Sequence, residues 1–274
     1  MNAMRHLILA IALCAQGCVN AQKTPATSPK KIDTSHSGEG LSGRKLVSEI
    51  RVVNFEGSNA LSELDNGIWL FYEDCPAAKT LTAQISRVSV LFPSIPVGIV
   101  VINGWTESKN FPLDQPPNGI PWTVAIVDGE LKGGFLGAWS PGSESDPYWS
   151  KLNQDMIRLL AISAGLIDQS PKDIPFAFKL NQLEFNSYVS DGRSFNNVKV
   201  GAVRAPKANL SKRSIFASSF RGANLSKADF SNSLLTGNDF SNADLSGARF
   251  DGAKLFNTTC PDGSLQKEGA CNSQ

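Results

Sequence analysis

A five-residue period near the C-terminal end is the feature that most restricts how this chain can fold. The large residues of the period are Leu210, Ile215, Phe220, Leu225, Phe230, Leu235, Phe240, Leu245, Phe250 and Leu255, and two places before each stands mostly Ala or Ser. Helices repeat about every 3.6 residues and strands about every two, so this period fits neither and predicts a solenoid of stacked coils. Arg213 and Asn238 break the small-residue rule, and we expect them at the N-terminal edge and at a local bulge.

The pattern resembles the pentapeptide-repeat family, whose members wind four repeats per coil into a right-handed quadrilateral β-helix with the large residue inside. The resemblance implies such a β-helix over residues 199–257, where ten clear repeats make two and a half coils and Phe195 and Val200 would extend it to three. Some members mimic DNA and bind topoisomerases through an acidic surface. Residues 207–254 carry seven bases against four acids, which argues against mimicry and favours a rigid spacer or an interaction surface.

So short a solenoid exposes its core at both ends, and both ends need caps. We expect the preceding domain and a connector at residues 167–198 to cover one end, and residues 258–274 to cover the other. Beyond residue 21 the chain has three cysteines, of which the near neighbours Cys260 and Cys271 pair most economically. Their disulfide is expected to contribute about 2–3 kcal/mol, and Cys75 is left as a free thiol.

Residues 1–21 have the character of a secretory leader, with a positive start and an apolar stretch, Leu7–Ala15, that is too short to span a bilayer. Cleavage after Val19-Asn20-Ala21 leaves a soluble protein. The alternative rests on Ala15-Gln16-Gly17-Cys18, which resembles a bacterial lipoprotein site with lipid on Cys18. Both alternatives predict an exported protein, either in the periplasm or anchored by lipid to the bacterial envelope. Residues 22–45 are rich in Ser, Thr, Pro, Gly and Lys and predict a disordered tether.

Charge and histidine content exclude several classes of protein. The formal net charge is +1, which gives no support for nucleic-acid binding. The two histidines are His6, in the leader, and His36, in the tether. The folded part therefore lacks the residue that Cys-His proteases, Ser-His-Asp hydrolases and His-ligated zinc sites require. We expect no metal and no cofactor.

Residues 68–79 predict a buried strand that leads into a helix with a cysteine at its N-terminus. The apolar run Ile68–Tyr72 is followed by two acids, by Cys75-Pro76 and by helical spacing. Free N–H groups and the helix dipole stabilise a thiolate at this position, whereas Glu73 and Asp74 raise the pKa of the thiol. Farther along, Gly119-Ile120-Pro121 leads into a second strand that ends at an Asp-Gly turn.

This arrangement resembles the thioredoxin family, in which a cis proline lies beside the reactive cysteine and helps to hold the substrate peptide. The resemblance covers about residues 50–166 and implies an α/β thioredoxin-like domain at 46–166, with Cys75 as the reactive thiol and Pro76, Ile120 and Pro121 along a substrate groove. Two positions depart from the family, because Ala78 stands in place of the second cysteine and Trp69 in place of a buried acid. Dithiol chemistry is therefore not available.

The expected elements of this domain follow from apolar runs and helical spacing. In chain order they are a strand at Val47–Phe55, a short helix at Ser58–Leu64, the strand at Ile68–Tyr72, a helix from Pro76, a strand at Val97–Ile102, a hairpin of Thr123–Val127 and Lys132–Leu136, and a closing helix around Trp149–Leu160.

Two functions remain open from the sequence. In the first, Cys75 attacks a disulfide or a sulfenic acid and forms a mixed disulfide that an outside thiol resolves, so that a monothiol exchange module is joined to an interaction scaffold. In the second, the thioredoxin-like domain is degenerate, and the chain is a non-enzymatic interaction or structural protein of the envelope. The sequence does not identify the partner, which is an envelope protein or a thiol substrate, nor the oligomeric state.

Overall fold

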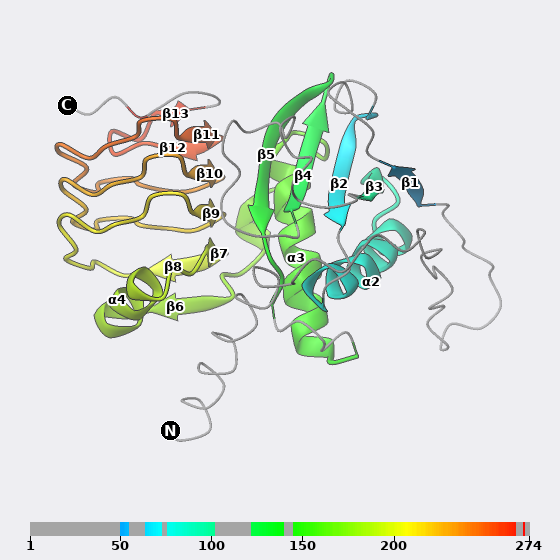
Figure 1. Cartoon of the computed structure of the whole chain (residues 1–274), viewed down its shortest axis with the longest axis horizontal. Coiled ribbons are helices and arrows are strands. Elements are labelled where there is room, and N and C mark those ends of the chain that lie inside the picture. Colours follow the sequence, from blue (N-terminus) through cyan, green and yellow to red (C-terminus); the bar gives the residue numbers. More distant parts are fainter. Residues whose placement is uncertain are drawn as a thin grey trace, which may run out of the picture.

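The computed structural model describes residues 50–54, 64–72, 76–101, 122–139, 145–266 and 271. These residues form two parts that lie side by side, an α/β layer and a stack of short strands (Figure 1). Phe135 of the α/β layer and Phe216 of the stack belong to one cluster of buried side chains, and their ring centroids are 4.9 Å apart. The two parts therefore share a continuous apolar core.

The α/β layer contains a mixed five-stranded sheet. Its strands are β1 (Arg51–Asn54), β2 (Gly67–Tyr72), β3 (Val97–Val101), β4 (Trp122–Val127) and β5 (Glu130–Leu136), in the spatial order β1-β3-β2-β4-β5. β1 and β2 run parallel to β3, whereas β4 is antiparallel to both β2 and β5. The predicted hairpin about Asp128-Gly129 is confirmed, and both turn residues have positive φ, as a two-residue hairpin turn requires.

Two helices, α2 (Pro76–Leu91) and α3 (Pro147–Ser163), pack against each other and against this sheet. The helix predicted from Pro76 is confirmed, and its predicted inner residues Leu81, Ile85 and Val88 are fully buried. The predicted closing helix is α3, which begins after the capping carboxylate of Asp146. The predicted helix at Ser58–Leu64 lies outside the described residues except for Leu64.

The stack is a β-helix-like solenoid with a coil of twenty residues. On one side its strands are β7 (Phe195–Asn196), β9 (Ser214–Phe216), β10 (Leu234–Thr236) and β11 (Lys254–Phe256), paired in parallel with Phe195 opposite Ile215 and Leu235 opposite both Ile215 and Leu255. The other sides are joined by bridges with the same spacing, such as Lys199–Ser219, Arg204–Asn224 and Asn209–Asp229. Each coil therefore holds four five-residue repeats.

We number the four sides of a coil by their inward residues. Side 1 contains Phe195, Ile215, Leu235 and Leu255; side 2 contains Val200, Phe220, Phe240 and Cys260; side 3 contains Ala205, Leu225 and Leu245; side 4 contains Leu210, Phe230 and Phe250. Aromatic residues of one side stack between coils, with ring centroids 5.0 Å apart for Phe220 and Phe240 and 4.9 Å apart for Phe230 and Phe250. The predicted inward direction of the large residues is confirmed by this stacking.

Most sides end at a residue with positive φ, two places after the inward residue. These residues are Asn197, Lys207, Lys212, Ala217, Gly222, Lys227, Asn232, Gly237, Asn242, Gly247, Gly252 and Asn257. Gly and Asn tolerate this conformation best, which explains their recurrence at five-residue intervals.

The connector supplies the cap at the N-terminal end of the solenoid. After a 3₁₀ turn, η2 (Pro171–Asp173), β6 (Phe178–Leu180) pairs with β8 (Val198–Val200), and Phe178 again lies twenty residues before its partner Val198. α4 (Gln182–Ser190) follows and buries Phe185 and Tyr188 against Phe195, at ring distances of 5.6 and 5.3 Å. The α/β layer lies along side 1 and also contacts this cap, where the ring centroids of Trp139 and Phe178 are 5.1 Å apart.

At the other end, β12 (Thr258–Thr259) and β13 (Leu265–Gln266) form an antiparallel pair. A disulfide joins Cys260 to Cys271, whose Cα atoms are 5.5 Å apart, and both side chains are buried in the cluster that contains the solenoid core. In the part of the chain that the structure describes, no three His, Cys, Asp or Glu side chains are grouped to hold a metal ion. None of the described helices is long and apolar enough to cross a membrane.

Candidate functional site

Side 1 of the solenoid packs against β5, the edge strand of the sheet, through hydrogen bonds and buried apolar side chains. We call this contact surface the docked face. Figure 1 shows β5 between the rest of the sheet and the strands β9, β10 and β11. The backbone N–H of Gly134 donates to Thr236 Oγ1 at 3.2 Å, and that of Leu136 donates to Ser214 Oγ at 3.1 Å. Asn196 Nδ2 donates to the Leu136 carbonyl at 2.9 Å. Polar side chains of three coils thus satisfy an edge that would otherwise lack partners.

Two glycines allow β5 to pack closely, Gly133 against the solenoid and Gly134 against β4. A Cβ atom on Gly133, whose φ is +138°, would lie 2.5 Å from Cγ2 of Thr236. A Cβ atom on Gly134 would lie 2.8 Å from the carbonyl oxygen of Thr123 on the neighbouring strand. A side chain at either position would force the neighbouring strand away, so Gly133 sets the spacing of the docked face and Gly134 that between β4 and β5.

Apolar residues complete the docked face. Phe216, Leu234 and Phe256 stand next to inward residues of side 1 but point out of the solenoid, and each is buried. Leu234 and Phe256 share a cluster with Trp122 and with Leu136 of β5. The sequence carries a signal for this face, because two apolar residues are adjacent only once per coil, at Ile215-Phe216, Leu234-Leu235 and Leu255-Phe256. A period of twenty cannot be seen in a five-residue window, so the five-residue period alone does not predict this face.

The C-terminal end of α3 gives a second contact between the two parts. Asn257 Nδ2 donates to the carbonyl of Ser163, and the Oγ of the same serine lies 2.7 Å from the place a Cβ atom on Gly237 would occupy. Asn257 and Gly237 occupy the same corner position, after side 1 of successive coils. The two parts therefore meet along β5 and again at the end of α3, which resists rotation about either contact.

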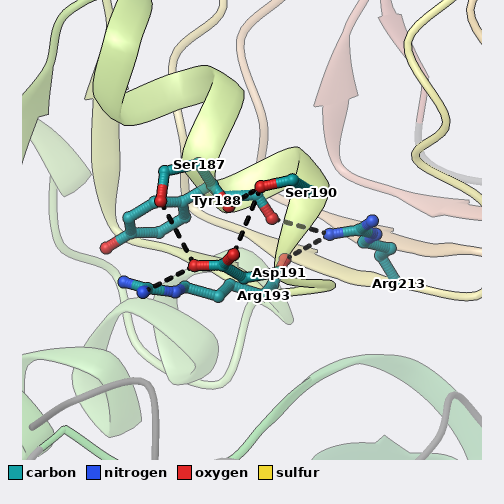
Figure 2. Close-up of polar contacts among 6 residues, drawn as sticks. All are labelled: Ser187, Tyr188, Ser190, Asp191, Arg193 and Arg213. Atoms are coloured by element: carbon teal, nitrogen blue, oxygen red, sulfur yellow. Dashed lines mark hydrogen bonds and ion pairs between the residues drawn. The ribbon is translucent and has the colours of Figure 1, made fainter. Parts of the chain in front are cut away.

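Arg213 holds the N-terminal cap in place. Its guanidinium donates to the carbonyls of Tyr188 at 3.0 Å, Val189 at 2.7 Å, Arg193 at 3.1 Å and Asn209 at 3.2 Å. Figure 2 shows this group reaching the end of α4, where Arg193 also pairs with Asp191. Helix carbonyls near a C-terminus carry partial negative charge, so a cation is stabilising there. Burial lowers the pKa of Arg213 and raises that of Tyr188.

The two exceptions to the small-residue rule are thus explained. Arg213 lies next to the N-terminal cap, near the edge where we expected it. Asn238 is buried in the wall between sides 1 and 2, where its Nδ2 donates to the Ile215 carbonyl at 2.8 Å and its Oδ1 accepts from the Ser218 N–H at 3.0 Å. Thr258 continues this wall in the next coil and donates to the Leu235 carbonyl. The residue at 238 is therefore a polar bridge between coils.

A hollow of about 510 Å³ lies between α2 and α3 and is lined by Arg87, Lys151, Asp155 and Arg158 among others. The buried Asp155 carboxylate pairs with Lys151 at 2.7 Å and with Arg158 at 3.2 Å. Arg158 also lies 4.4 Å from the ring centroid of Phe92. These contacts bind the two helices together, and the residues that line the hollow include no cysteine and no histidine.

The predicted redox site lies mostly beyond the described residues. Cys75, Ile120 and Pro121 are outside them, as is the predicted lipidation site Cys18. Pro76 is exposed at the first position of α2. Their roles stay predictions.

Two positions that depart from the thioredoxin pattern are described. Ala78 is fully buried. Trp69 is buried on the sheet, where its Nε1 donates to the Asp65 carbonyl at 2.9 Å and its ring fills the space that a Cβ atom on Gly98 would need. β2 carries Trp69 where the resemblance to thioredoxins would place a buried acid, and the strand contains no acidic residue.

Comparison with known families identifies the solenoid. Residues 218–256 match the model for pentapeptide repeats, with eight copies. The C-terminal part is a pentapeptide-repeat solenoid. The match begins at Ser218, whereas the ladder begins at Phe195, and the first coil carries Arg193, Val198 and Val203 where the repeat favours small residues. The chain matches no curated protein and no solved structure.

Proposed function

We propose that this protein is an interaction scaffold in which the α/β part is held in one orientation on side 1 of the pentapeptide-repeat solenoid, while sides 2 to 4 receive a protein partner. The observation that carries the proposal is the docked face. Side 1 makes three hydrogen bonds to β5 and buries Phe216, Leu234 and Phe256. Side 1 is therefore occupied by an intramolecular contact. At the outward positions of sides 2 to 4 the repeats instead carry polar and charged residues, which suit a reversible partner.

Site-specific photo-crosslinking from the full chain in its own cells tests this proposal. A photo-reactive residue in place of Ser226, which is outward on side 3, is expected to form an adduct with a partner protein. The same residue in place of Thr236 on the docked face is the matched control and is expected to react within the chain. Absence of intermolecular adducts from positions on all three open sides would refute the scaffold.

A second function is favoured by the topology of the sheet, namely monothiol exchange in a thioredoxin-like domain. The strand order β1-β3-β2-β4-β5, in which only β4 runs opposite to the other four strands, resembles that of thioredoxins, and α2 starts at the residue after Cys75. In this proposal the Cys75 thiolate attacks a partner disulfide and releases one partner thiolate. The resulting mixed disulfide is then broken by an outside thiol, because Ala78 cannot act as a resolving cysteine.

The pH dependence of Cys75 alkylation decides between this function and a degenerate domain. Cys260–Cys271 stays oxidised during the measurement and so does not react. A thiol pKa at or below about 7, against about 8.5 for a free cysteine, supports exchange. A pKa at or above the free value leaves the scaffold as the whole function.

We also propose export to the bacterial envelope, on the strength of the leader at residues 1–21. The mass of the mature N-terminus distinguishes cleavage after Ala21 from lipid attachment at Cys18, and retention of the intact leader would contradict both alternatives.

A further inference from the structure

Six exposed cations form a band around the first two coils of the solenoid. They are Lys199 and Arg221 on side 2, Arg204 on side 3, Lys207 and Lys227 at the corner after side 3, and Lys212 at the corner after side 4. Between Asp191 and Asp229 the chain contains no Asp or Glu. We call these six residues the basic band. None of the six lies on the docked side 1, and all are exposed.

The solenoid fold does not require this charge distribution. Where the outward residue before an inward one is Asn or Asp, as at Asn209, Asn224, Asp229, Asp239 and Asp244, it accepts a hydrogen bond from the N–H two places later. Asn224 accepts from the Ser226 N–H at 3.2 Å, and Asp244, its bridge partner in the next coil, accepts from the Ser246 N–H at 3.0 Å. The first coils thus use the neutral residue at a position where the later coil uses the charged one.

The cations of the band have no carboxylate partner among the described residues. Other arginines of this region are paired, as Arg193 is with Asp191 and Arg249 with Asp251. Lys207 and Lys227 occupy the same corner in successive coils, where neighbouring strands are about 4.8 Å apart. Like charges on side chains that start from neighbouring strands repel each other, and an anion placed across the two coils would be attracted to both.

The later coils limit what kind of anion fits. The coils that follow the band toward the C-terminus carry carboxylates, namely Asp239 on side 2, Asp244 on side 3 and Asp262 in the C-terminal hairpin. A long polyanion that ran along the solenoid would meet these carboxylates. At the outward positions of sides 2 to 4 in the described coils there is no aromatic residue, so nucleic-acid bases have no stacking platform. A short anionic chain that crosses the solenoid over its first two coils avoids both problems.

We propose that the basic band binds a short acidic segment, rich in Asp and Glu, of a partner protein. This inference rests on the scaffold function proposed above and names the chemistry of its partner. The segment lies across the solenoid axis, with its carboxylates between the lysines and arginines of sides 2 and 3, and the acids of the later coil set its position along the axis.

Fluorescence anisotropy with a labelled octaglutamate peptide tests the proposal on the full chain. The band variant is Arg221→Gln with Lys207→Gln and Lys227→Gln. The control variant, Lys172→Gln with Lys179→Gln and Lys254→Gln, removes three exposed cations outside the band and changes the net charge equally. We expect the band variant to weaken binding about tenfold or more and to reduce its salt dependence, and the control to weaken it by less than about twofold. Asp244→Asn is expected to strengthen binding.

Equal loss in both variants would overturn the proposal, because binding would then follow net charge alone. Tighter binding of duplex DNA or of phosphatidylglycerol vesicles than of the peptide, with the same dependence on the band, would also overturn it, as would salt-sensitive dimerisation through the band. Thermal unfolding of the variants is expected to match that of the parent chain. If crosslinking from Ser226 captures a partner while octaglutamate fails to bind, the scaffold stands and the acidic segment is wrong.

Discussion

Replacing Arg213 by alanine is expected to loosen the N-terminal cap of the solenoid. The substitution removes four hydrogen bonds from one guanidinium to the carbonyls of Tyr188, Val189, Arg193 and Asn209. A hydrogen bond to a charged group contributes about 1.5–3 kcal/mol. The four bonds are not additive, because they share one group whose burial is itself costly. We therefore expect a loss of about 3 kcal/mol, near the lower end for breaking a buried ionic network.

The loss should be local as well as global. A destabilisation of about 3 kcal/mol in a chain of this size lowers Tm by roughly 6–12 °C. Amide hydrogen exchange should quicken most in α4 and β6, whereas β10 and β11 keep their protection at low denaturant. Arg213→Lys should be intermediate, since an ammonium group replaces a planar fork that reaches several carbonyls at once.

Arg249→Ala is the matched control for Arg213→Ala. Arg249 pairs with Asp251 in the same solenoid, but both side chains are more than half exposed, at 64% and 75%. Such a pair contributes at most about 1 kcal/mol. If Arg213→Ala changes stability no more than Arg249→Ala does, and exchange in α4 is unchanged, the assignment of Arg213 as the residue that holds the cap is refuted.

Three further predictions concern the docked face, the disulfide and acid. Gly133→Ala should cost about 2 kcal/mol more than Gly137→Ala, judged by chemical denaturation, because a Cβ atom at 133 meets Thr236 whereas one at 137, also at positive φ, meets nothing within 4 Å. Reduction of Cys260–Cys271 should lower the free energy of unfolding by about 3 kcal/mol, and an unchanged Tm in reductant would contradict this. Hydrogen bonds from the Ser246 side chain and backbone lower the pKa of Asp244 in the folded protein. The stability that this carboxylate contributes is therefore fully present above its unfolded pKa of about 4, and it is lost as the pH falls through its folded pKa. Asp244→Asn should therefore flatten the decline of Tm below about pH 4, and identical pH profiles would refute this origin.

The repeats and the elements of the α/β part could be predicted because their signals are local. An inward Phe220 or Leu235 is visible from the five-residue period alone, and Ile68–Tyr72 and Val97–Ile102 are apolar runs long enough for interior strands. The start of the ladder at Phe195 was suggested by the same period. These predictions needed only the direction of side chains along one coil or one strand.

The cap and the docked face depend on contacts between distant segments. Arg213 breaks the small-residue rule, and the sequence does not show why. Its hydrogen-bond acceptors are backbone carbonyls, which no sequence pattern marks. Phe216 and Leu234 look like ordinary members of a repeat, since a window of five residues cannot separate the outward positions of side 1 from those of side 3. Their apolar character becomes a signal only when residues twenty apart are compared.

The docked face also explains how the solenoid and the sheet stabilise each other. An edge strand such as β5 presents unpaired N–H and C=O groups, which in many proteins are covered by another backbone. Here Thr236, Ser214 and Asn196 cover them with side chains, so β5 and β10 are held without forming a continuous sheet. The two sheets therefore stay separate, and Gly133 allows Thr236 to approach β5 closely. Among the described residues, a rigid junction of this kind leaves sides 2 to 4 of the solenoid uncovered by the α/β layer, which suits the interaction scaffold proposed above.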